Sequence, residues 1–405
     1  MIKQFMKKWK NLSKDFILNI IASFMLTAAT QVVVYPMLAH KFSSEIYGEI
    51  LTLMGIVSIA IVALGNSLDN VRLIVNSDYE KEQVQGDFNI IALIVSIISV
   101  IITGVASGVF FGQTPIEIIL LCIYVGIMTF NTYACVEYRL LLNFKKILIC
   151  NTVTAVGYIL GVLLLEKIPV WPLPFACAMI IQLLYVLCTT KVYREKWSFT
   201  PLWKKTISKY SILIMTGLFS NMLIYMDRLL IYPLLGSDSV STYSVAAFFG
   251  KSLGIVMIPV AGVLLGYFSQ SGFQMSVRKF RQINGISLIL GIGFMVLAVV
   301  LSPIITKLLY PDIYMDARSY LFMANLGATI SVVCSLTQAA VLKFAPTRVQ
   351  LIKEVAYCVT YVVTCLLLLE KYELWGFCIA ALVANLVKLL ILYVLGEVYL
   401  KEKRK

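Results

Sequence analysis

The chain has little charge and almost no histidine. Charged residues make up 14% of its 405 residues, where soluble domains have roughly a quarter, and His40 is the single histidine. The patterns GxxxxGK and HExxH do not occur, so neither a P-loop ATPase nor a zinc protease of that type is indicated. No connection between apolar runs is long enough for a soluble catalytic domain. The sequence therefore predicts a protein that is not an enzyme, with no cofactor and no metal site.

Two further features exclude other classes. The nine cysteines are scattered through apolar runs without a CxxC pair, which is typical of small buried side chains and not of a disulfide or metal framework. The net charge of +13 comes from basic residues between apolar runs, and no nucleic-acid-binding pattern accompanies them. We therefore expect no nucleic-acid partner and interpret the basic residues as topology signals.

Hydrophobic residues are abundant instead. They make up 60% of the chain, and the mean hydropathy is +0.89. Apolar runs of about 20 residues recur throughout, which predicts an all-α, polytopic membrane protein. Twelve transmembrane helices are expected, at 16–38, 46–69, 88–110, 116–138, 147–165, 173–190, 210–234, 241–268, 284–306, 319–342, 352–369 and 375–396.

Most of the 34 Lys and Arg residues fall on alternate connections, beginning with the N-terminal tail. Because basic residues remain on the cytoplasmic side, this pattern predicts cytoplasmic N- and C-termini and supports an even number of spans. The first apolar run is longer than the core of a signal peptide, so we expect it to be retained as a span.

The two halves of the chain resemble each other. LLLEKIPVW at 163–171 matches LLLEKYELW at 367–375, and YPMLAHKFSSEIYG from Tyr35 matches YPLLGSDSVSTYS from Tyr232 with one gap. Six spans per half give both halves the same orientation, as in transporters built from parallel repeats. We therefore predict an N-terminal six-helix lobe at 1–190, a basic cytoplasmic linker at 191–209 and a C-terminal six-helix lobe at 210–405.

Charged residues also occur inside the predicted spans. Asp227 and Arg228 lie in the seventh span, Lys251 in the eighth and Lys388 in the twelfth. A charge at membrane depth costs about 3 kcal/mol or more, so it is usually functional and faces a cavity. One alternative is an internal ion pair of Asp227 with Lys251 or Arg228, which would hold two helices together. The cations in excess favour an anionic substrate.

A second set of charges closes two spans near the expected cytoplasmic surface. Asp69 and Arg72 end the second span, and Glu137 and Arg139 end the fourth. These four residues are candidates for a cytoplasmic gate. The alternative is that they are solvated interface charges.

The segment MDRLLIYPLLGSDSVSTYSVA resembles the start of the second half of polysaccharide flippases, which belong to the multidrug/oligosaccharidyl-lipid/polysaccharide exporter superfamily. That family has an Asp-Arg pair on its seventh span, then Leu-Gly and a Tyr-containing entry to the eighth. The segment FILNIIASFMLTAATQVVVYPMLAHKFSSEIYGEI is similar to the family's first hairpin. Span number, chain length and duplicated halves agree over the whole chain.

The resemblance implies two six-helix lobes in a V around a central cavity. It implies ion-coupled export of undecaprenyl-pyrophosphate-linked oligosaccharide repeat units across the bacterial inner membrane, for O-antigen or capsule synthesis. We expect the pyrophosphate at Arg228, Lys251 or Lys388, and a proton or sodium ion at Asp227. The sugars would meet polar side chains at Gln31, Asn221, Asn325 and Gln338. The expected partners are membrane lipid and glycan polymerase machinery.

Several alternatives remain at this point. A small-molecule or multidrug antiporter of the same fold is the first, although its cationic substrates would favour acidic sites. Lipid II flippases of the superfamily usually have fourteen spans, so twelve argues against that branch. A glycan polymerase or ligase would need a long outer loop with catalytic Arg or His, and the outer loops here are short. A scaffolding protein would not need charges within its spans.

Overall fold

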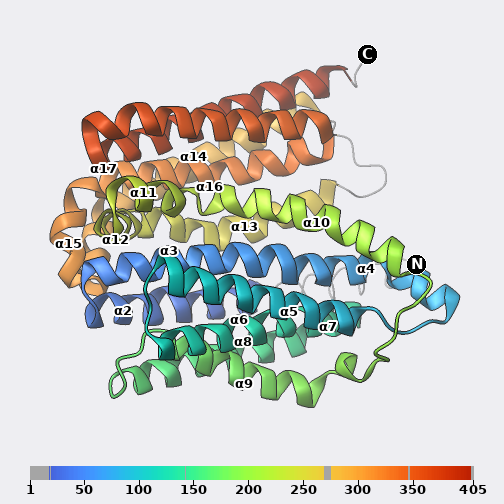
Figure 1. Cartoon of the computed structure of the whole chain (residues 1–405). Helices are drawn as coiled ribbons and strands as arrows, with labels where there is room; N and C mark the ends of the chain where they lie inside the picture. Colours follow the sequence, from blue (N-terminus) through green and yellow to red (C-terminus); the bar gives the residue numbers. More distant parts are fainter. Residues whose placement is uncertain (1–17, 19, 142, 269–274, 345–346, 403–405) are drawn as a thin grey trace. The chain divides into compact units, whose positions relative to one another are not determined.

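The computed structural model describes residues 18, 20–141, 143–268, 275–344 and 347–402, and within them every regular element is a helix (Figure 1). The basic N-terminal tail lies outside the described residues. The elements in the first half of the chain are η1 (Ala29–Val34), α2 (Tyr35–Lys41), α3 (Ser44–Ile61), η2 (Val62–Asn66), α4 (Ser67–Glu82), α5 (Phe88–Val105), η3 (Ala106–Phe110), α6 (Pro115–Ala134), α7 (Val136–Leu140), α8 (Phe144–Leu165), α9 (Leu173–Thr189), η4 (Val192–Arg194) and α10 (Trp203–Ile224). The chain continues with α11 (Met226–Leu235), α12 (Ser237–Ala246), α13 (Phe248–Phe268), α14 (Val277–Leu309), α15 (Pro311–Ala317), η5 (Arg318–Tyr320), α16 (Leu321–Phe344) and α17 (Thr347–Glu402).

The predicted fold class is confirmed. Among the described residues, nine helical segments are long and apolar enough to cross a membrane. Leu173–Thr189 is a shorter apolar helix at the predicted sixth span, and α13 covers most of the predicted eighth. The segment Ile352–Lys401 includes a reversal at Glu373 (φ 47°, ψ −130°), so it contains both the eleventh and the twelfth predicted spans.

Three predicted spans are each two helices in the structure. The span predicted at 116–138 is interrupted at Cys135 (φ −66°, ψ −10°), which separates α6 from α7. The span predicted at 210–234 is interrupted at Tyr225 (φ −98°, ψ 15°), which separates α10 from α11. The span predicted at 241–268 is interrupted at Ala247 (φ −85°, ψ −3°), between α12 and α13. Hydropathy reports the composition of a window, and one residue with a ψ near zero changes the helix without changing the composition. The sequence therefore predicted the apolar runs and missed their breaks.

Several helix starts follow from local sequence. Thr114 and Glu117 form a reciprocal capping box at α6, with Pro115 in the first turn. The Asn143 side chain accepts the backbone N–H of Lys146 at the start of α8. Such caps satisfy amide groups that have no partner within the helix.

The chain forms two compact units. Unit 1 comprises Met1–Lys41 and Glu49–Leu229, and unit 2 comprises Phe42–Gly48 and Leu230–Lys405. Unit 1 extends through α10, because α10 packs on η2 and α4. The predicted lobes and the linker at 191–209 stay a prediction. Within unit 1, the Tyr210 hydroxyl donates to the Leu64 carbonyl at 2.9 Å.

Small residues allow close helix packing in both units. In unit 1, α8 packs along α9, and a Cβ on Gly161 would lie 2.4 Å from the Cα of Pro174. In unit 2, α16 packs against α13, α14 and α17. There a Cβ on Gly250 would lie 2.7 Å from the backbone oxygen of Asn325. Close approach of backbones is the usual basis of helix association in membranes.

Candidate functional site

Arg228 lies near the start of α11, half-buried in unit 1. The helix is interrupted at Tyr225, and α11 begins one residue later. One guanidinium nitrogen of Arg228 donates to the carbonyl oxygen of Leu51 at 2.7 Å. A Cβ on Gly55 would lie 3.2 Å from Cδ of Arg228, so this glycine leaves room for the side chain on α3. The unit therefore holds a permanent cation inside a predicted span.

Aromatic side chains surround this arginine. Its Cζ lies 5.5 Å from the centre of the Tyr225 ring, and it also interacts electrostatically with Tyr35. Tyr35 packs on Phe175 at 6.2 Å between ring centres, and Phe175 makes an edge contact with Tyr158 at 5.8 Å. Aromatic faces and hydroxyls are suitable neighbours for a guanidinium at low dielectric. The result is a cation within an aromatic, hydroxyl-bearing interior.

Asp227 precedes Arg228 and is 6% exposed. Its Oδ1 accepts the backbone N–H of Arg228 at 2.9 Å. A carboxylate in the first turn of a helix is favoured by the helix dipole. The predicted coupling role of Asp227 stays a prediction.

The two predicted polar residues of unit 1 differ in their contacts. Gln31 is half-buried in η1, a π-helical stretch of the first span. Such stretches often occur at functional sites. Asn221 is also half-buried, and its amide donates to the Gly217 carbonyl of its own helix at 2.8 Å.

Lys388 and Lys251 lie in unit 2. Lys388 is half-buried on α17, with Nζ 4.5 Å from the centre of the Tyr357 ring. The Tyr357 hydroxyl donates to Oδ1 of Asn385 at 3.3 Å. Lys251 is exposed on α13, with Nζ 5.3 Å from the Tyr243 ring. Of the two lysines, Lys388 is therefore the more enclosed.

A second buried lysine in unit 2 was not predicted as a site residue. The side chain of Lys353 is 2% exposed, and its Nζ lies 2.6 Å from Oε1 of Glu354. Gln338, a predicted polar residue, donates to the same oxygen at 3.5 Å. Lys353 also interacts electrostatically with Lys388. Lys353 stands at the start of a predicted span, where a basic residue in the sequence indicates only membrane topology.

Asn325 is 1% exposed, and its Oδ1 accepts the backbone N–H of Gly250 at 2.6 Å. This bond joins α13 to α16 where their backbones are closest. Its role in packing is therefore observed, and its role toward sugars stays a prediction.

The four gate candidates all have partners inside unit 1. Asp69 forms an ion pair with Arg139, and Arg72 forms one with Glu195 at 2.7 Å. The Glu137 carboxylate accepts the backbone N–H of Lys191 at 2.5 Å. Asp69 and Arg72 are 7% and 8% exposed, so these two are not solvated interface charges. The gate role stays a prediction.

Arg72, Glu137 and a residue that sequence reasoning missed hold the connecting segment 190–202 between α9 and α10. This residue is Asp87, fully buried before α5 with a φ of 68°. Its carboxylate accepts the Thr200 N–H at 2.7 Å, the Tyr79 hydroxyl at 2.6 Å and the Thr200 hydroxyl. An Asp before an apolar run indicates a helix start. Nothing local indicates partners more than a hundred residues away.

Glu195 gives the connecting segment a dependence on pH. Burial raises the pKa of its carboxyl above the ordinary value, while the Arg72 guanidinium lowers it and Glu137 raises it. A raised pKa in the folded state means stability that is present at low pH and is lost as pH rises through the folded pKa. Because Gln resembles the protonated carboxyl, we expect the Tm of wild type to fall relative to that of Glu195→Gln as pH rises from about 4 to 7. Thermal unfolding in detergent measures it; a wild-type Tm that rises relative to that of Glu195→Gln would contradict the assignment.

Comparisons with known proteins agree on the fold. No family model and no curated protein matches the sequence. An inward-facing multidrug resistance MATE family transporter of the MOP superfamily aligns with a TM-score of 0.64 and 13% identity, over 96% of this chain and 95% of that one. The lipid II flippase MurJ, inward closed, aligns with a TM-score of 0.66 and 16% identity, over 94% and 85%. The Vibrio cholerae MATE transporter VcmN, in the bent form, aligns with a TM-score of 0.61 and 14% identity, over 98% and 97%. This multi-pass membrane protein therefore has the two-lobe helical fold of MOP superfamily transporters.

Proposed function

We propose that this chain is a flippase that exports undecaprenyl-pyrophosphate-linked oligosaccharide repeat units across the bacterial inner membrane by alternating access. The glycan serves as O-antigen or capsule, and both termini lie in the cytoplasm. The observation that carries the proposal is Arg228, a cation held inside unit 1 by Leu51 and surrounded by tyrosines. A permanent positive charge at such a site would repel cationic drugs.

The chemistry of the cations suits a pyrophosphate. A guanidinium is planar and binds phosphate oxygens with two parallel hydrogen bonds, so it both attracts and orients the group. In unit 2, the enclosed ammonium of Lys388 provides a second point charge over Tyr357. Lys251 would serve the same anion, and Gln31, Asn221, Asn325 and Gln338 would contact the sugars.

Export against a gradient requires an energy source, for which we propose a proton or sodium ion. Asp227 is the carboxylate nearest to Arg228 in the chain, so occupation of Asp227 by a cation would change the field at the arginine. Asp69, Arg72, Glu137 and Arg139 would form the cytoplasmic gate. The oligosaccharide lipid is the substrate, and glycan polymerase machinery would receive it on the outer side.

The test is complementation of a bacterial strain that lacks its own oligosaccharide-lipid flippase. We expect expression of this chain to restore surface glycan and to clear the lipid-linked repeat units that accumulate on the inner face. A panel of strains with different repeat units then defines the cargo. Correctly inserted protein that restores glycan in none of these strains would reject the proposal.

A multidrug antiporter is the second candidate, because two of the similar structures are MATE transporters, one described as a multidrug resistance protein. The buried carboxylate of Asp227 favours it, since cationic drugs need an acidic partner. Resistance profiling in the same flippase-deficient strain separates the two. Raised tolerance to cationic compounds without glycan export would select the antiporter.

A further inference from the structure

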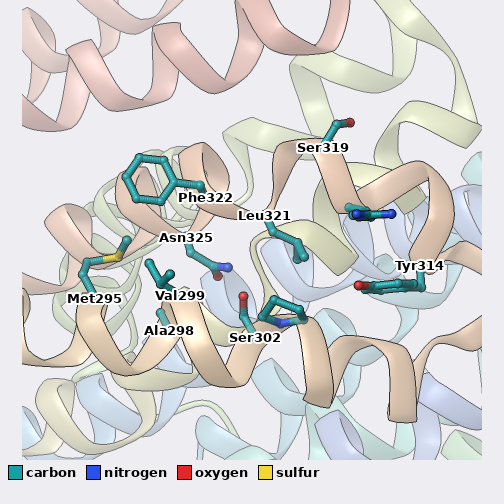
Figure 2. Close-up of a pocket in the computed structure, with 11 residues that line it drawn as sticks. Met295, Ala298, Val299, Ser302, Tyr314, Ser319, Leu321, Phe322 and Asn325 are labelled. Carbon is teal, nitrogen blue, oxygen red and sulfur yellow. The ribbon is translucent and has the colours of Figure 1, made fainter.

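Unit 2 contains a cavity that shares only Asn325 with the residues discussed so far. It has a volume of about 360 Å³ and lies among α14, α15, η5 and α16 (Figure 2). Its lining residues are Met295, Ala298, Val299, Ser302, Pro303, Tyr314, Arg318, Ser319, Leu321, Phe322 and Asn325. This size is at the lower end of the range for small-ligand sites. The cavity is therefore large enough for a headgroup and too small for an oligosaccharide.

The polar groups of the cavity are hydrogen-bond donors gathered from four elements. Arg318 and Ser319 come from η5, Tyr314 from α15, Ser302 from α14 and Asn325 from α16. Figure 2 shows the amide of Asn325 and the hydroxyl of Ser302 facing the same space between the two long helices. A guanidinium, three hydroxyls and an amide make a site for an anion with additional acceptor oxygens.

Asn325 provides the clearest sign of a missing partner. The residue is 99% buried, and its Oδ1 is occupied by the Gly250 N–H. Its Nδ2 is buried and has no hydrogen-bond partner among the described residues. Leaving such a donor unsatisfied is unfavourable, and natural structures seldom do so without a reason. A ligand acceptor in the cavity would satisfy it.

The cavity has a polar end and an apolar flank. Arg318 stands at the beginning of η5. Ser302 is seven residues before the end of α14, which places it about 10 Å from that end by the helical rise. Val299 and Phe322 are exposed on the flank. A phospholipid has this order of groups, with its phosphate outermost, ester carbonyls below and acyl chains to the side. Basic pockets between membrane helices are known to hold lipid headgroups.

A second hollow of about 560 Å³ shares Ser319 with this cavity. It is acidic, because Asp238, Asp316 and Glu373 line it. Adjacent cationic and acidic sites match a headgroup that carries a phosphate and an ammonium group. We propose that the pair of hollows binds one phosphatidylethanolamine molecule, with its phosphate at Arg318, its ammonium among the acids and its ester carbonyls at Ser302 and Asn325. This inference goes beyond the proposed export, and it assigns Asn325 to the bound lipid in place of the sugars.

The leaflet follows from the topology. Arg278, Lys279 and Arg281 cluster at the start of α14, and the cavity lies at its other end. Basic residues mark the cytoplasmic side, so the bound lipid belongs to the outer leaflet.

The experiment is native mass spectrometry of the full chain in detergent, titrated with dioleoyl phosphatidylethanolamine or dioleoyl phosphatidylglycerol. We expect one phosphatidylethanolamine to bind more tightly than phosphatidylglycerol. Arg318→Gln should weaken both lipids about 10-fold or more, since a charge-assisted hydrogen bond is lost. Asp316→Asn should weaken phosphatidylethanolamine alone. Lys307→Gln is the matched control, because Lys307 is exposed at the same end of α14 and does not line the cavity.

Asn325→Asp tests the deeper group without removing the acceptor for Gly250. It should lower phosphatidylethanolamine affinity about 5-fold or more, because the donor is lost and a carboxylate repels the ester oxygens, and thermal stability without lipid should also fall, because the carboxylate is buried. Equal affinities for wild type, Arg318→Gln and Lys307→Gln would overturn the proposal. Soluble phosphoethanolamine that binds as tightly as the lipid would overturn it too, since the site would then serve a free anion. Displacement of the lipid by undecaprenyl pyrophosphate at lower concentration would assign the cavity to the export substrate instead.

Discussion

Replacement of Arg228 by Ala is expected to abolish surface glycan in the complemented strain while the protein still inserts in the membrane. The guanidinium is half-buried and held by the Leu51 carbonyl at 2.7 Å. Its removal takes away the planar donor that would bind the pyrophosphate. Loss of hydrogen bonds to a charged group costs about 1.5–3 kcal/mol each, so two such bonds amount to a fall in transport rate of about 100-fold or more. Surface glycan staining and the lipid-linked pool on the inner face measure it.

Two variants make this result specific. Arg228→Lys keeps the charge and loses the two-pronged geometry, so export should be reduced yet measurable. Arg194→Ala removes an exposed arginine from the connecting segment and should leave export near wild type. Normal glycan export by Arg228→Ala at an unchanged protein level would reject the role of Arg228 in binding pyrophosphate. Equal losses in Arg228→Ala and Arg194→Ala would point to net charge and not to the site.

Among the residues that hold the connecting segment, Asp87 is the one whose replacement by Ala should lower the stability of the protein most. The carboxylate is fully buried and accepts hydrogen bonds from Tyr79 and from both the N–H and the hydroxyl of Thr200. Its removal leaves the buried Tyr79 hydroxyl and the half-buried donors of Thr200 without this acceptor, which costs about 3–5 kcal/mol in total. We expect a lower Tm in detergent and lower steady-state expression.

Trypsin gives a local readout of the same change. Lys196 is exposed in the connecting segment, and the anchored segment should resist cleavage there. Asp87→Ala should speed the cut at Lys196 before the helices unfold. Asp78→Ala is the control, since Asp78 forms exposed ion pairs with Lys205 and Lys209 and such pairs contribute little. Unchanged cleavage and unchanged Tm in Asp87→Ala would show that the segment is held by its other contacts.

Much of the fold was predictable because its causes are local. An apolar run identifies a membrane helix without reference to any other part of the chain, and a capping residue such as Thr114 acts within four positions. The same reasoning indicates Arg228 and Lys388 as candidate binding residues, because a charge inside an apolar run can be recognised from the sequence itself.

Other features depend on partners that the sequence does not bring near one another. From its position in the sequence, Lys353 indicates only membrane topology. The packing of unit 2 shows that its side chain is buried and paired with Glu354. Asp87 is separated from Thr200 by more than a hundred residues, so no local pattern reveals their bond. The break at Tyr225 and the packing of α10 in unit 1 likewise follow from contacts and not from composition.

The amino-acid sequence by itself determined the all-helical membrane class, the positions of the spans and the cations within them, since hydropathy and charge are properties of each residue. The tertiary structure alone decided which unit α10 joins, which carboxylates anchor the connecting segment and which cavity Arg318 and Asn325 both line. These outcomes depend on distances between helices, and a linear pattern contains no such distances.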